Sequence, residues 1–234
     1  KSAEGRFTNS NQKRFTSMLG GAANGEKIPL SLLFRPFSER ERNTAIDILG
    51  EDTWAVDDVY ENETATFDED LFLEYLEDVI KPYLISHGGG EGKNKKRAAF
   101  FLDIATHHVT PAVYLWLKKH NVDKYLIPAS LTYKLQMVDV SLAAQYKNHL
   151  YTLWCTWMLK QIEENKFRIP SLNYIAPSKG KCIEWCSIAW NMITNENIKN
   201  GCTRCYMSPT NLDDAVSKYE NVDLESIDWS KEIV

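Results

Sequence analysis

The chain has 234 residues, 44% of them apolar and 25% charged, which excludes collagen-like, coiled-coil and wholly disordered proteins. The formal charge of −5 argues weakly against nucleic acid as a partner, and we expect no membrane contact because no run of 18 apolar residues occurs. The chain begins with Lys and shows no signal-peptide core, so we expect it to be part of a longer protein.

The N-terminal part predicts a β-hairpin and a third strand. Residues 14–34 form two apolar segments, separated at Asn24-Gly25, a strong hairpin turn signal. Polar residues 38–52 predict a connection with a helical turn. Residues 53–56 predict another short strand.

A helix is predicted to begin at Thr66, because Thr66 and Glu69 have capping-box spacing. We expect Pro82 to bend or end it. The glycine-rich and basic residues 87–97 predict a flexible loop. The apolar face of this helix is formed by Leu71, Phe72, Tyr75, Leu76, Val79 and Ile80.

The middle of the chain predicts a buried central strand over 98–103, because an apolar run there ends in Asp103. Thr110-Pro111 predicts a helix start, with an N-cap followed by Pro. A short strand is predicted over 124–128. Further predictions are a helix over 139–162, a polar loop over 163–180, and helices over 182–192 and 194–206.

Two aspartates, Asp103 and Asp139, carry the main functional hypothesis. Asp103 ends a strand and Asp139 begins a helix, with 35 residues between them. Strand ends and helix starts converge at one edge of an α/β sheet, where two carboxylates can share divalent cations. The alternative is that Asp103 only ends the strand and Asp139 only caps the helix.

Two motifs around these acids resemble the pogo/Tigger group of DDE-superfamily transposases. FLDIATHH is similar to the LDNAPSH-like motif of that group, with matches at Leu102, Asp103, Ala105 and His108. LIPASLTYKLQMVDVSLAAQYK is similar to the LPPNTTHLLQPLDVGVFGPLK-like motif. Its matches are Pro128, Thr132, Leu135, Gln136, Asp139, Val140 and Lys147. The resemblance extends, in the same order along the chain, over about residues 12–206.

The resemblance implies an α/β, RNase H-like mixed sheet flanked by helices, with DNA as substrate. It also implies two Mg²⁺ ions held by three acids, of which Asp103 and Asp139 are the second and third, supported by His108, Gln136 and Lys147. We expect the first strand and its acid upstream of Lys1; Glu4, which lacks an apolar strand around it, is a poor candidate.

The chain departs from the motifs at positions that lie close to the two acids in the sequence. Ile104 replaces the usual Asn, Thr106 replaces a Pro, and Met137 replaces the Pro of QPLD. An Asn beside a metal-binding acid can orient it, whereas Ile cannot. The sequence therefore leaves open an active transposase or a host-adopted relative with weakened catalysis.

The cysteines have the spacing of a zinc site, but we favour another interpretation. Cys182, Cys186, Cys202 and Cys205 form C-x3-C and C-x2-C pairs within predicted helices, where packing of two helices explains them better than zinc. The odd total of five favours reduced, intracellular thiols. In the same way, we expect Trp154, Trp157, Trp185 and Trp190 to lie in the core rather than to stack on bases.

A basic run is the candidate nucleic-acid contact, although a solvated loop is the more common outcome for such runs. It consists of Lys93, Lys95, Lys96 and Arg97. We expect residues 1–207 to form the endonuclease domain and 208–234 an acidic tail. The tail holds seven acids against two lysines from Asn211 onward, which favours a nuclear protein partner if catalysis is lost. The expected location is the nucleus.

Overall fold

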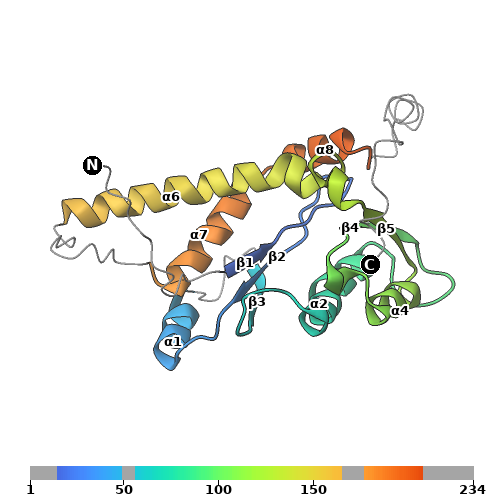
Figure 1. The fold of residues 1–234 in the computed structure, drawn as a ribbon, viewed down its shortest axis with the longest axis horizontal. Helices are drawn as coiled ribbons and strands as arrows, with labels where there is room; N and C mark the ends of the chain where they lie inside the picture. Colours follow the sequence, from blue (N-terminus) through green and yellow to red (C-terminus); the bar gives the residue numbers. More distant parts are fainter. Residues whose placement is uncertain (1–14, 49–55, 165–176, 208–234) are drawn as a thin grey trace, which may run out of the picture.

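The computed structural model describes residues 15–48, 56–164 and 177–207, which form a mixed α/β structure (Figure 1). Its five strands form two sheets, one with the order β1-β2-β3 and one with β4-β5. The strands are β1 Phe15–Met18, β2 Leu30–Phe34, β3 Val56–Glu61, β4 Ala98–Asp103 and β5 Val122–Ile127.

The predicted hairpin is confirmed. β1 pairs antiparallel with β2, and Gly25 in the connection has a φ of 92°, a conformation that glycine adopts without strain. The predicted helical turn after it is a ten-residue helix, α1 (Glu39–Ile48). Of the strand predicted over 53–56, residues 53–55 lie outside the described ranges; the described strand begins at Val56 and pairs parallel with β2.

The second sheet pairs β4 parallel with β5, so that Asp103 lies opposite Ile127. The predicted bounds of β4 are confirmed, but the prediction that the strand is buried on both faces is wrong. Leu102 packs against helices on one face, whereas Ala99 and Phe101 on the other face are exposed among the described residues. β5 begins two residues earlier than predicted.

The helix predicted to begin at Thr66 begins later. Asp68 is the N-cap of α2 (Glu69–Tyr75), and its carboxylate accepts a hydrogen bond from the Leu71 N–H. Nor does Pro82 end the helical run, because a π-helical turn, η1 (Leu76–Ile80), precedes it and α3 (Lys81–Ser86) continues beyond it. The predicted apolar face is confirmed, with five of its six residues buried and Leu71 packed beside them.

The predicted start of α4 (Pro111–Lys119) is confirmed, since the Thr110 hydroxyl accepts a hydrogen bond from the Val113 N–H. The long helix predicted from Asp139 is a π-helical turn followed by a 21-residue α-helix. The remaining elements are η2 Thr106–His108, η3 Ala129–Leu131, α5 Thr132–Leu135, η4 Val138–Leu142, α6 Ala143–Glu163, α7 Lys179–Met192 and α8 Asn195–Arg204.

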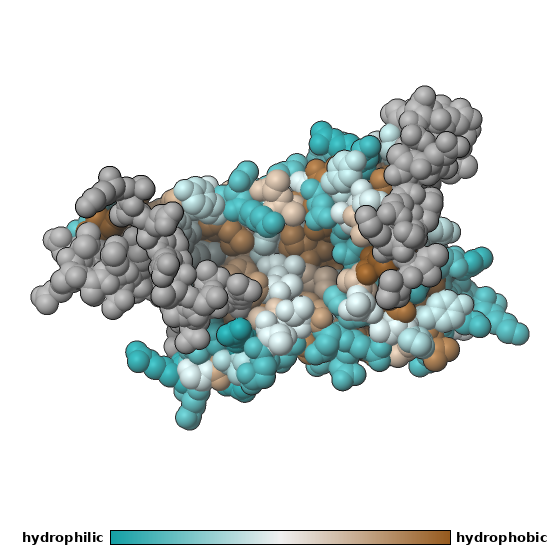
Figure 2. Space-filling view, in the orientation of Figure 1, coloured by the Kyte–Doolittle hydropathy of each residue, from teal (hydrophilic) through white to brown (hydrophobic). Residues whose placement is uncertain are grey.

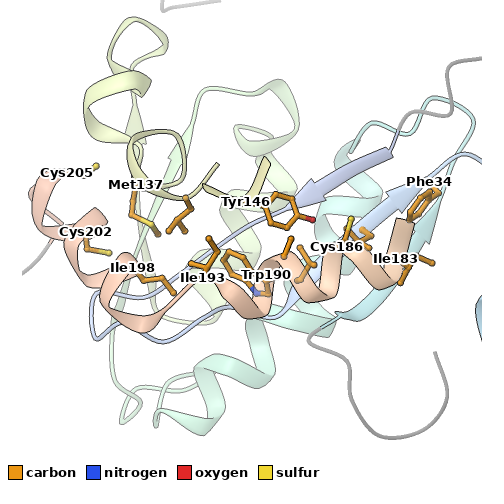
Figure 3. Packing of buried hydrophobic residues seen from close by; sticks show 14 of the residues in the cluster. Phe34, Met137, Tyr146, Ile183, Cys186, Trp190, Ile193, Ile198, Cys202 and Cys205 are labelled. Carbon is orange, nitrogen blue, oxygen red and sulfur yellow. The ribbon is translucent and has the colours of Figure 1, made fainter. Parts of the chain in front are cut away.

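Strand β2 is buried on both faces and separates two apolar clusters. Leu32 packs in the cluster shared with α6, α7 and α8, around Trp190 (Figure 3). Leu33 points into the other cluster, where α2, η1 and α4 also receive Leu102 from β4. The helices α2, η1 and α4 therefore pack against strands of both sheets.

In Figure 1, α6 runs along one side of the molecule, while α2 and α4 lie beside β4 and β5 at one end. Among the helices of the described ranges, none combines the length and apolar character needed to span a bilayer.

Candidate functional site

Asp103 is held at the C-terminal end of β4 by a neighbouring histidine. Its Oδ1 lies 2.6 Å from Nδ1 of His108 and accepts a longer, 3.3 Å hydrogen bond from the Ala105 N–H. The hydrogen bond from His108 is the main reason that the pKa of Asp103 is lowered, against the opposing effect of partial burial. The carboxylate is therefore ionised and fixed in orientation.

His108 owes its position to the short helix η2, which turns the chain back toward the strand end. The imidazole is buried against Phe72 of α2, with ring centroids 4.5 Å apart, and its Nε2 has no hydrogen-bond partner in the described structure. His107, which also contacts Phe72, has a lowered pKa, mainly because of burial and secondarily because of His108. Of the two histidines, only His108 touches Asp103.

Gln136 brings the second motif near the first. Its side chain lies close enough to the Asp103 carboxylate to contribute to the lowered pKa of that acid, although less than His108 and the Ala105 N–H do. Gln136 lies two residues before η4, and its carbonyl accepts a hydrogen bond from the Val140 N–H at 2.9 Å. Two segments 33 residues apart in the sequence therefore approach one carboxylate.

Asp139 follows Gln136 by three residues, on η4, and its side chain is exposed. The π-helical turn η4, which carries Asp139, packs closely against α8. There, a Cβ added to Gly201 would lie 2.9 Å from Cβ of Ser141, so the two backbones approach closely. Lys147 is exposed on α6, eight residues or about 12 Å along the helix from Asp139.

The motif residues carry oxygen atoms of the kind that a hard divalent cation prefers. They are the carboxylates of Asp103, at the end of β4, and Asp139, on η4, and the amide Oε1 of Gln136, which is buried without a hydrogen-bond partner. Within the described ranges, no group of three His, Cys, Asp or Glu side chains could hold a metal ion.

The residues of the predicted basic run differ in the contacts that they make. Arg97 donates from one nitrogen to both carboxylate oxygens of Asp123, at 2.7 Å each. Lys93, Lys95 and Lys96 are exposed in the loop before β4. The run therefore forms one ion pair at the start of the sheet and a solvated basic loop.

The four cysteines with zinc-like spacing lie on α7 and α8. Cys186, Cys202 and Cys205 are buried in the apolar cluster of Figure 3, and Cys182 packs against it. Burial raises the pKa of Cys186 to about 12 and that of Cys205 to about 11, as expected for thiols in an apolar setting.

The tryptophans are only partly as predicted. Trp185 and Trp190 are buried, and Trp157 packs edge-on against Trp185. The prediction of a core position is wrong for Trp154, which is 41% exposed beside a pocket of about 470 Å³. Trp154 lies eight residues after the buried Tyr146, about 80° around α6, and so at the margin of its packed face rather than at the centre.

Sequence reasoning missed a second basic surface, at the outer side of β5. There Lys118 of α4 and Lys124 of β5 line a pocket of about 600 Å³ with Arg97 and Tyr114. Two sequence features could have indicated this surface. The strand VDKYLI directs successive side chains to opposite faces, and a lysine pair stands in the last turn of α4, just before it.

Sequence comparison shows the class of protein to which the chain belongs, the DDE-superfamily endonucleases. The family model described as DDE superfamily endonuclease matches residues 12–202, and the chain belongs to this family. Within it, the chain is pogo-like, being similar to "Pogo transposable element with KRAB domain" of Mus musculus and of Homo sapiens.

The mouse relative is 27% identical over 205 residues, which cover 86% of this chain and 30% of the relative. The human relative is 30% identical over 120 residues, which cover 51% of this chain and 19% of the relative. The chain thus spans less than a third of either protein. No solved structure shows significant similarity to it.

Proposed function

We propose that this domain is the DNA-acting endonuclease part of a pogo-like transposase, with Asp103 and Asp139 as its metal-binding, catalytic acids. The observation that carries the proposal is the contact of His108 with the Asp103 carboxylate, which fixes that acid at the end of β4. The Gln136 side chain, close enough to affect the pKa of Asp103, belongs to the segment that bears Asp139 and supports the same proposal. A pre-oriented carboxylate loses less entropy when it binds a metal ion.

Each side chain has a distinct role in this proposal. Asp103 and Asp139 would hold Mg²⁺, two ions in all, and Gln136 lies in the same segment as Asp139. Bound there, the ions would supply positive charge to stabilise the attacking and leaving oxygens of a phosphodiester. His108 keeps the Asp103 carboxylate in one orientation through its Nδ1. Lys147 neutralises a phosphate further along the DNA.

We further propose an RNase H-like sheet completed by one more strand, which brings the third acid. Among the described strands, β1 pairs only with β2 and β4 pairs only with β5, so each has an edge open to another strand. The strand is expected N-terminal to Phe15.

A nuclease assay with the full-length protein tests this function. We expect cleavage of DNA carrying the transposon ends in Mg²⁺ or Mn²⁺, and its loss in Asp103→Asn, which keeps size and removes charge. Asp78→Asn, at an exposed carboxylate on η1, is the matched control and should cleave normally. Equal cleavage by the wild type and Asp103→Asn would remove the catalytic role.

A second candidate is a catalytically silent nuclear module that binds DNA or a protein through its acidic tail. It is favoured by Ile104, whose side chain cannot hydrogen-bond to Asp103, and by the 2.6 Å contact of Asp103 with His108, which also suits a structural role. In that case the wild type does not cleave with any divalent ion. Asp103→Asn then lowers stability without changing any catalytic rate.

A further inference from the structure

The pocket between α4 and the outer edge of β5 has an excess of positive charge. Its charged lining is Arg97, Lys118 and Lys124, against a single carboxylate, Asp123. Asp123 is already neutralised by Arg97, which remains 75% exposed and donates to it from only one of its nitrogens. A guanidinium carries five N–H donors, so most of them face the pocket and solvent.

The other two cations are not committed to carboxylates. Lys118 is exposed at the end of α4 and has no ion pair among the described residues. Lys124 lies with its Nζ 5.6 Å from the centre of the Tyr114 ring, a cation–π contact that keeps the ammonium within the pocket. By contrast, the neighbouring Lys119 is paired with Glu91. The positive charge is therefore concentrated on one side of α4.

Two half-exposed aromatic rings lie on either side of the β5 edge. Tyr114 and Tyr125 are each 52% exposed, although tyrosine is usually more covered in a folded chain. Tyr114 belongs to α4, on the helical side of the sheet, whereas Tyr125 stacks on Phe101 of β4 on the opposite face, with ring centroids 5.2 Å apart. Aromatic faces beside cations are the combination with which proteins bind the bases and phosphates of a single strand, here one that passes over the edge of β5.

The position of the pocket is distinct from that of the acids. It is lined by the first residues of β5, up to Tyr125, whereas Asp103 lies opposite Ile127 at the other end of the sheet. From Lys124 to Ile127 is three residues, about 10 Å along the strand. β5 is also an edge strand among those described, so its backbone groups are open on the pocket side.

In Figure 2, the end of the molecule that holds α4 is mostly hydrophilic, with single apolar side chains between polar ones. This mixture does not suit an apolar protein partner, which requires a contiguous apolar patch.

We propose that this pocket binds a single strand of DNA. Lys118, Lys124 and Arg97 contact its phosphates, and its bases stack on Tyr114 and Tyr125. Because the pocket shares no side chain with the acid site, its binding does not depend on catalysis. An acidic peptide is the competing occupant, since it also offers negative charge, but it would leave both aromatic faces without partners.

Fluorescence anisotropy with full-length protein in an Asp103→Asn background tests the pocket apart from cleavage. The probes are a labelled oligothymidylate of about 15 nucleotides, the duplex of the same length, and a polyglutamate peptide. Lys118→Gln/Lys124→Gln removes two phosphate contacts. It should weaken oligothymidylate binding about tenfold at physiological salt and lower the slope of log K against log salt by about 1.4.

Two further variants separate stacking from charge. Tyr114→Ala should weaken binding about tenfold without changing the salt slope, whereas Tyr114→Phe keeps the ring and should bind normally. Lys160→Gln, at an exposed lysine on α6, is the control for loss of a single surface charge and should leave binding unchanged. Thermal unfolding by circular dichroism confirms that each variant folds.

The proposal is overturned if Lys118→Gln/Lys124→Gln binds oligothymidylate as tightly as Lys160→Gln does. It is also overturned if polyglutamate binds more tightly than oligothymidylate and loses affinity in the double variant, which would assign the pocket to an acidic peptide. The two proposals can fail separately. A chain that does not cleave DNA can still bind oligothymidylate through the pocket, and weak binding at the pocket does not test cleavage at the acids.

Discussion

Replacement of Lys179 by Met should be one of the most destabilising single changes in the chain. The ammonium, in a side chain only 10% exposed, donates to the carbonyls of Arg35 and Pro36, at 3.1 and 2.7 Å, and lies 3.2 Å from Glu41 Oε2. It also lies 4.5 Å from the centre of the Phe37 ring. The substitution leaves a carboxylate and two carbonyls without this donor.

Removing one partner of such a buried pair costs about 3 kcal/mol, or roughly a hundredfold in the folding equilibrium constant. Urea unfolding followed by circular dichroism measures this cost. Lys181→Met is the matched control, two residues along the same helix. Its side chain is 36% exposed with one ion pair to Glu184, so its loss should change stability by less than about 0.5 kcal/mol. Equal midpoints for the two variants would refute the reasoning.

Three other predictions follow from the packing of the described residues. Burial opposes the ionisation of Glu41, but the Ser38 backbone N–H and Lys179 outweigh it and lower the pKa of Glu41 to about 2. The contribution of Glu41 to the unfolding free energy should therefore be present above about pH 4.5 and fall by about 1–2 kcal/mol between pH 4.5 and 2, so that Glu41→Gln loses that much less stability than the wild type over this range. Gly201→Ala places a Cβ 2.9 Å from Ser141 and should lower stability by about 1–3 kcal/mol in urea, and an unchanged midpoint would contradict the close approach of α8 to η4. Elemental analysis of purified protein should find zinc well below one equivalent, because the thiols pack in the core, whereas stoichiometric zinc would contradict that interpretation.

Local signals predicted much of the fold. Asn24-Gly25 fixed the hairpin, and Thr110-Pro111 fixed the start of α4, because each imposes a backbone geometry without help from distant residues. The helix start at Thr66 was wrong because Asp68, two residues later, is an equally good cap, and local pattern cannot decide between them. The π-helical turn before Pro82 has no sequence signature, yet its wider turn lets the helix pass the proline.

Part of the candidate site could likewise be predicted from local sequence, and part of it could not. The apolar run that ends in Asp103 marked a strand end, and His108 was placed beside it by resemblance, but its contact with Oδ1 depends on the turn of η2. The approach of Gln136 to Asp103 involves segments that only the tertiary fold brings together, so no local pattern could predict it. The pocket at Lys124 is also a tertiary feature, since α4 and β5 form it jointly.

Divalent-metal binding, measured by isothermal titration calorimetry with Mg²⁺ and Mn²⁺ on the full-length protein, tests the central claim most directly. If Asp103 and Asp139 hold the ions together, Asp103→Asn and Asp139→Asn should each weaken binding at least about tenfold, and the double variant should be little worse than either. Unchanged affinity in Asp139→Asn, or binding by neither the wild type nor the variants, would contradict a shared metal site at the end of β4.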